Sequence, residues 1–136
     1  MMVEIDEEPL GFLFAYSRGA YPREAIVALR GRTSAEGVVS IKEAVVPMTR
    51  TEGHHFSTWS LSGVADSATV GMGHSHPSGV LKPSEQDLRS FFGKVMLIVA
   101  PPFNDESCAR FFGRNGEEVP FKVIWKSPFR RFSFDG

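Results

Sequence analysis

The chain has 136 residues, a length that suits one compact domain, and 42% of them are hydrophobic, enough for a sizeable core. Its 15 Lys and Arg residues against 16 Asp and Glu residues give a formal net charge of -1, which argues against a nucleic-acid binder with its usual basic surplus. The single cysteine, Cys108, excludes an intrachain disulfide and any zinc site built from several cysteines, and a buried apolar role is expected for it.

The start of the chain argues against export and membrane insertion. The segment MMVEIDEEPL is acidic and too polar for a signal peptide, and no apolar run in the sequence approaches the ~20 residues of a membrane span. We therefore expect a cytoplasmic protein with no membrane partner.

The first half of the chain predicts a helix followed by two strands. Residues 7–18 predict an amphipathic helix, because apolar side chains recur at helical spacing and acidic residues precede a basic end. The apolar run 24–29, which ends at Gly31, predicts a strand buried on both faces. Residues 38–46 predict a second strand, ended by Pro47.

The middle of the chain predicts a long loop, a strand and a second helix. The polar stretch 49–66 predicts the loop, with room for one strand around residues 56–61. Residues 69–74 predict a strand. A helix is expected to begin at residues 84–87, since apolar side chains recur at three- and four-residue steps as far as Val95.

The last third of the chain predicts a strand and a hairpin. The apolar run 95–100 predicts a strand that two prolines end. Residues 109–113 and 119–125 predict the hairpin, because an Asn-Gly turn lies between them. With no repeat and no linker, the economical interpretation is one layered α/β domain.

The most informative segment joins two histidines to an acidic residue. His74 and His76 lie two residues apart at the end of a predicted strand, so both imidazoles project to the same side. Pro77 ends that strand, and a short loop returns the chain to Asp87 in the first turn of the predicted helix. Two histidines and one carboxylate leave the fourth tetrahedral position of a zinc ion for water, as hydrolysis requires.

Each part of this pattern also has a simpler interpretation. An isolated HxH pair more often belongs to surface or core histidines than to a metal site. The spacing of Ser84 and Asp87 also fits a capping box that opens a helix. The two interpretations are compatible, because a capped helix start holds a carboxylate rigidly.

The combination resembles the signature of the JAMM (MPN-plus, JAB/Mov34-type) metallopeptidases, which reads HxHP, six residues, then SxxD. The segment 20–24 before the first strand is similar to the family's upstream glutamate element, and the resemblance extends from Leu10 to Trp125. It implies the cytidine-deaminase-like MPN fold, a mixed, mostly antiparallel sheet flanked by helices, over residues 1–126. The tail 127–136 lies outside the resemblance, and its role is unassigned.

The resemblance also implies a role for each residue of the motif. His74, His76 and Asp87 would bind one Zn²⁺ per chain. Glu24 would accept a proton from the attacking water and pass it to the leaving amine, and Ser84 would donate a hydrogen bond to the oxyanion. The complete ligand set favours an enzyme over the family's inactive members.

The family's usual substrates suggest the reaction. We expect hydrolysis after the Gly-Gly C-terminus of a ubiquitin-like modifier or sulfur-carrier protein, whose tail would add as a strand beside a sheet edge. Phe56 and Trp59 are candidates for one wall of that groove, although core packing is the commoner fate of aromatic residues in a small domain. The resemblance allows a homodimer, but no surface stripe in the sequence demands one.

Several alternatives remain at this stage. The scissile bond is either an isopeptide bond to a target protein or a peptide bond in a linear precursor. A zinc-binding MPN scaffold or modifier-binding module with little activity is a further alternative. Residues 74–79 also match the HxHPSG stretch of the RadC-like proteins, but the near-neutral charge argues against DNA binding.

Overall fold

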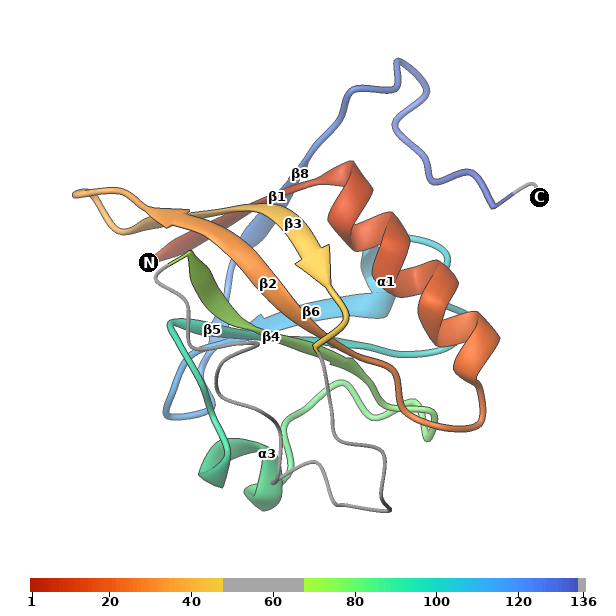
Figure 1. Ribbon diagram of the computed structural model, residues 1–136, viewed down its shortest axis with the longest axis horizontal. Helices are drawn as coiled ribbons and strands as arrows, with labels where there is room; N and C mark the ends of the chain where they lie inside the picture. The colour runs from red at the N-terminus through yellow and green to blue at the C-terminus, as the bar shows by residue number, and fades with distance from the viewer. Residues whose placement is uncertain (48–67, 135–136) are drawn as a thin grey trace.

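The computed structural model describes residues 1–47 and 68–134, and the predicted loop that contains Phe56 and Trp59 lies outside them (Figure 1). The elements in chain order are β1 (Met2–Asp6), α1 (Glu7–Ala20), β2 (Ile26–Thr33), β3 (Val38–Val45), β4 (Thr69–Ser75), α3 (Glu85–Arg89), β5 (Val95–Val99), the 3-10 helix η2 (Glu106–Cys108), β6 (Ala109–Phe112), β7 (Glu118–Val119) and β8 (Phe121–Ile124). Within these ranges, no helix is long and apolar enough to cross a membrane.

The strands form one mixed sheet in the order β7-β6-β5-β4-β2-β3-β1-β8. The pairs β2–β3, β2–β4, β5–β6 and β6–β7 are antiparallel, whereas β1–β3, β1–β8 and β4–β5 are parallel. Helix α1 covers one face of the sheet, and the short α3 lies beyond the other (Figure 1). The predicted fold class, a mixed sheet flanked by helices, is confirmed.

Helix α1 owes its position to the apolar stripe that its sequence predicts. Leu10, Leu13 and Phe14 are fully buried in the main core cluster, which also takes in side chains from β1, β2, β3 and β5. Each such side chain contributes roughly 1.5–3 kcal/mol when it is removed from water. The acidic first turn and Arg18 in the last turn suit the helix dipole, as the sequence indicates.

The two ends of the sheet lie close together in space. β7 and β8 are at opposite ends of the strand order, yet only Pro120 separates them in the chain. The carbonyl of Pro120 accepts a hydrogen bond from the N–H of Val3 at 3.0 Å, and the rings of Phe111 and Phe121 lie 5.1 Å apart between centroids. The sheet therefore curls until its two ends meet at this proline.

The predicted second helix is wrong in length. It was expected to continue to Val95, but α3 has 5 residues, ends at Arg89, and buries none of them. Gly93 adopts φ +82, a conformation that favours glycine, and turns the chain into β5. Phe91 and Phe92 pack on separate small clusters under the sheet rather than on one helical face.

Three further details of the strands differ from the predictions. The first strand of the sheet, β1, was not predicted at all. The strand expected to end at Gly31 starts at Ile26 and continues to Thr33, with a register shift between Arg30 and Gly31. The second arm of the predicted hairpin is divided at Pro120, since β7 pairs with β6 while β8 pairs with β1.

The segment after β8 packs against α1. Glu7 accepts the backbone N–H groups of Lys126 and of Ser127, the latter at 2.6 Å. The ring of Phe132 meets that of Phe14 edge-on, with 5.1 Å between centroids, and the guanidinium of Arg18 lies 3.8 Å from the centre of the Phe134 ring. A domain boundary at residue 126 stays a prediction.

Candidate metal centre

The end of β4 brings two histidines to one carboxylate. The Nε2 atom of His76 lies 3.1 Å from one carboxylate oxygen of Asp87, and the Nε2 atom of His74 lies 3.6 Å from the other. The ligand atoms of the three residues all lie within 4.8 Å of one another. The strand end and the start of α3 thus meet as the sequence predicts.

These separations fit a tetrahedral zinc ion. Ligands roughly 2.0–2.1 Å from zinc at tetrahedral angles lie about 3.3 Å apart. The two nitrogen–oxygen distances, 3.1 and 3.6 Å, are close to that value, each to a different oxygen of Asp87. Two imidazoles and one carboxylate are also the donor set of hydrolytic zinc sites, which keep one position for water. His74, His76 and Asp87 therefore form a candidate zinc site.

A loop contact orients the ring of His76. Its Nδ1 atom lies 2.8 Å from the carbonyl oxygen of Val80 and donates its N–H there, so Nε2, 3.1 Å from an Asp87 carboxylate oxygen, is the nitrogen left to bind a metal. Gly79 permits this return of the loop, because it adopts φ +91 and donates its N–H to the carbonyl of His76 at 2.9 Å. The HPSG sequence therefore sets the tautomer that a metal needs.

His74 is held differently, by burial. It is only 8% exposed, and its Nδ1 atom has no hydrogen-bond partner among the residues described. Burial lowers the pKa of His74 to about 4, with Asp87 acting in the opposite direction. His74 is therefore neutral at pH 7, the form in which imidazole binds a metal.

Asp87 combines the two roles that its sequence position suggests. Its backbone N–H donates to the hydroxyl oxygen of Ser84 at 3.0 Å, and its carboxylate accepts the N–H of Ser84 at 2.8 Å, which completes a capping box. Burial alone would raise the pKa of Asp87, but the hydrogen bonds from Ser84 and the two histidines outweigh it and lower that pKa. The carboxylate is thus ionised and fixed for a cation.

Ser75 connects this centre to the strand that follows Glu24. Its N–H donates to the carbonyl of Ala25 at 3.0 Å, and its hydroxyl accepts the N–H of Ala25 at 2.9 Å. Because Ile26 pairs with His74 in antiparallel register, Glu24 comes opposite His76. Ser75 was not among the residues predicted for the site. The signal for it was its place between two histidines on the same side of the strand, which turns the serine side chain to the opposite face of the sheet.

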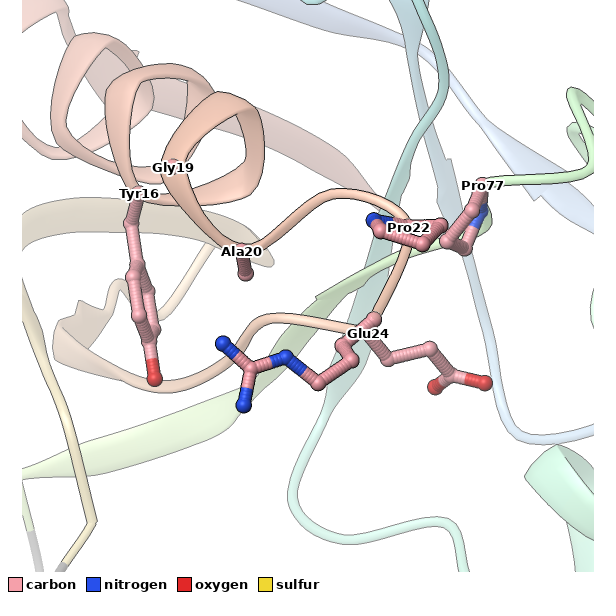
Figure 2. A pocket seen from close by; sticks show the side chains of 7 residues that line it. Tyr16, Gly19, Ala20, Pro22, Glu24 and Pro77 are labelled. Atoms are coloured by element: carbon pink, nitrogen blue, oxygen red, sulfur yellow. The ribbon is translucent and has the colours of Figure 1, made fainter.

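Glu24 itself is exposed and feels the charges of the centre. Partial burial of its carboxyl raises the pKa of Glu24, His76 lowers it, and Asp87 raises it, with a net increase. Glu24 also lines a pocket with the end of α1 and with Pro77, which Figure 2 shows. A carboxylate beside the centre with a raised pKa is suited to take and return a proton.

The structure thus brings five of the predicted site residues into one region. His74, His76 and Asp87 converge, Ser84 caps the helix that carries Asp87, and Glu24 lies opposite His76. Their catalytic roles remain predictions. The other two candidates, Phe56 and Trp59, lie outside the described residues.

Comparisons with known proteins agree with this arrangement. Residues 11–115 match the family described as prokaryotic homologs of the JAB domain. A protein of Haloferax volcanii named "Probable metalloprotease" is 29% identical over 130 residues, which cover 90% of this chain and 80% of the relative.

Solved structures resemble the chain over most of its length. A structure described as "JAMM: A Metalloprotease-like Zinc Site in the Proteasome and Signalosome" is 28% identical, with a TM-score of 0.62 over 91% of this chain and 99% of the other. A JAB1/MPN domain protein from Archaeoglobus fulgidus gives 28% identity and a TM-score of 0.63 with the same coverage. A protein from Desulfitobacterium hafniense, 20% identical with a TM-score of 0.65 over 94% of this chain and 97% of the other, shares the fold.

Proposed function

Because this chain belongs to the prokaryotic homologs of the JAB domain and is of the JAMM metalloprotease type, we propose that it hydrolyses the bond after the Gly-Gly C-terminus of a ubiquitin-like modifier or sulfur-carrier protein. The observation that supports the proposal best is the convergence of His74, His76 and Asp87 with Glu24 in register beside them. Zinc held by the three ligands would polarise the scissile carbonyl and lower the pKa of water toward ~7.

Glu24 is the group that we assign to proton transfer. Its position opposite His76, beside the candidate ligands, is where a general base can accept a proton from the attacking water and later donate it. Its exposure leaves it accessible to a substrate, and the Ser75–Ala25 pair fixes the backbone that carries it. Glu24 would take the proton of the attacking water and deliver it to the leaving nitrogen.

Ser84 is the group that we assign to the oxyanion. Its hydroxyl oxygen accepts the N–H of Asp87, and rotation about the C–O bond turns the hydroxyl proton either to the Asp87 carboxylate or to a substrate oxygen. A donor fixed by a helix cap needs little reorganisation when negative charge develops on the carbonyl oxygen. Ser84 would therefore stabilise the transition state rather than the bound substrate.

The choice of substrate rests on the family resemblance. A ubiquitin-like partner and a cytoplasmic location are parts of the proposal, as is the absence of a nucleic-acid partner, which the net charge of -1 supports. A binding module with little turnover is the competing interpretation, and the complete ligand set with Glu24 beside it argues against this alternative.

The test compares the zinc-loaded wild type with Glu24→Gln on ubiquitin-like fusions and isopeptide conjugates, followed by intact-mass analysis. Cleavage after Gly-Gly by the wild type alone is expected, while both proteins bind one zinc. Glu36→Gln is the matched control, because Glu36 is an exposed glutamate in the turn between β2 and β3. Equal cleavage by wild type and Glu24→Gln would contradict the role of Glu24, and binding without cleavage would favour the module.

A further inference from the structure

A pocket of about 830 Å³ opens beside Glu24, on the side of α1. The lining residues are Tyr16, Gly19 and Ala20 from the last turns of α1, Pro22, Arg23 and Glu24 from the segment that follows, and Pro77 after the histidine motif. In Figure 2, Tyr16 hangs from α1 with its hydroxyl turned away from the helix, while Glu24 extends from the neighbouring segment.

The pocket lies on the leaving-group side of the proposed reaction. If Glu24 delivers a proton to the leaving nitrogen, that nitrogen must come within hydrogen-bond reach of its carboxylate. The chain that follows the nitrogen then continues into the space that Glu24 shares with Tyr16 and Arg23. The acyl side of the substrate, in contrast, must point toward the ligands and Ser84.

Arg23 and Glu24 both line this pocket, the first with a positive charge and the second with a negative one. The side chain of Arg23 is exposed, and over residues 1–47 and 68–134 no carboxylate forms an ion pair with it. Its backbone N–H is already used, since it donates to the carbonyl of Ala20 at 2.8 Å. A guanidinium in a pocket with a tyrosine hydroxyl offers several donors to one carboxylate.

The carboxyl end of α1 carries the negative end of the helix dipole, and it repels a carboxylate in the pocket only weakly. The N–H groups of Tyr21 and Arg23 satisfy the carbonyls of Ser17 and Ala20, at 3.0 and 2.8 Å. A helix end of this kind changes the energy of a nearby charge by roughly 0.3–1 kcal/mol. A hydrogen bond to a charged group contributes about 1.5–3 kcal/mol, so a contact with Arg23 outweighs the helix end and is also what offsets the repulsion from the Glu24 carboxylate in the same pocket.

We propose that this pocket binds the free carboxylate of a short leaving peptide, with Arg23 and Tyr16 as its recognition residues. This rests on the proposed function and narrows it to linear precursors that carry a few residues after Gly-Gly. The volume of this open pocket is in the range of small-ligand sites, whereas an isopeptide-linked target protein would place a folded surface there. Arg23 is then a specificity-determining residue and takes no part in proton transfer.

The first test uses fusions of a ubiquitin-like protein extended after Gly-Gly by two residues, made with a C-terminal acid or a C-terminal amide. The wild type is expected to cleave the acid with a kcat/KM about 10-fold or more above the amide, as one charged contact implies. Arg23→Gln should lose that preference, Arg23→Lys should retain part of it, and Tyr16→Phe should weaken it. Arg32→Gln, a change at an exposed arginine on β2, should leave it intact.

The second test measures binding without turnover. The same dipeptide, as acid and as amide, is titrated into zinc-loaded Glu24→Gln protein and into its Arg23→Gln double variant, and the backbone amide shifts of residues 16–21, 23 and 24 are followed. Tighter binding of the acid that disappears with Arg23→Gln supports the pocket, even if no fusion is cleaved and the proposed function fails. Equal binding of acid and amide, or equal cleavage of both by the wild type, overturns the proposal.

Discussion

The hydroxyl of Ser75 accepts a hydrogen bond from the backbone N–H of Ala25 at 2.9 Å, across 50 residues of sequence. The return bond, from the Ser75 N–H to the Ala25 carbonyl, measures 3.0 Å. Ser75 is the residue between the two histidines, and Ala25 is the residue after Glu24. Ser75 and Ala25 are both fully buried, so this pair fixes the segment of the proposed base against the strand of the ligands.

Replacement of Ser75 by alanine should therefore affect both folding and catalysis. The N–H of Ala25 would be left buried without its acceptor, which costs roughly 1–3 kcal/mol of unfolding free energy. Chemical denaturation measures this loss, and turnover should fall although zinc binding is retained. Ser133→Ala, at an exposed serine of the tail, should change neither quantity. Normal activity in Ser75→Ala would show that the pair does not position Glu24.

Removal of the metal should lower the thermal stability of the protein. A ligand that binds only the folded state stabilises it by about 4 kcal/mol at a thousand-fold excess over its Kd. We expect the melting temperature to fall after chelation and to recover with Zn²⁺. Asp87→Asn and His76→Ala should abolish the recovery, whereas Glu36→Gln should keep it. An unchanged melting temperature on chelation would count against the site.

The metal-free protein should lose stability in mild acid because of His74. The pKa of this buried histidine is lowered from 6.5 to about 4. Between these two pH values the unfolded chain therefore binds a proton at His74 that the folded chain does not bind. The free energy of unfolding should decrease as the pH falls from about 6.5 to about 4 and level off below, a total on the order of 3 kcal/mol. Asp87, with its lowered pKa, adds a loss only below its usual value of 3.8.

Denaturation curves of the metal-free protein across this pH range measure the effect. The His74→Gln variant lacks the titrating group, so its stability should depend less on pH between those values. A wild-type curve as flat as that of His74→Gln would show that His74 is accessible to protons in the folded protein.

Ser84→Ala should separate catalysis from metal binding. Loss of one oxyanion donor typically lowers turnover by about 10²–10³-fold. The same change removes the acceptor for the Asp87 N–H, a helix cap that contributes about 1 kcal/mol. Kinetics and zinc titration measure the two effects, and Ser84→Thr, which keeps a hydroxyl, should restore most of both. A variant with normal turnover would rule out Ser84 as the donor.

The sequence was most informative where the structure depends on local periodicity and spacing. Helix α1, the strand that ends in the histidine pair and the capped start of α3 follow from patterns only a few residues long. The convergence of His74, His76 and Asp87 was predictable for the same reason, because a strand end, a turn and a helix start lie within one short segment.

The features that were missed depend on contacts between distant parts of the chain. In β1, buried Val3 and Ile5 alternate with half-exposed residues, and β3 and β8 are its partners. The segment is short and contains charged residues, so its sequence alone did not predict a strand. The apolar spacing after Asp87 suggested a longer helix, yet Phe91 and Phe92 pack on the sheet and Gly93 turns the chain. No local sequence pattern predicts the hydrogen bonds between Ser75 and Ala25.

During synthesis on the ribosome, the edge of β1 that pairs with β8 has no hydrogen-bonding partner until residue 124 has been made, because β8 is the last strand in the chain order. Every proposed zinc ligand is synthesised earlier, since Asp87 precedes β8 by more than thirty residues. An emerging chain thus holds the complete ligand set while the sheet is still open, and open edges favour association with other chains. We expect fragments that end before Phe121 to aggregate through β1. Light scattering measures this aggregation, and the full chain should show none under the same conditions.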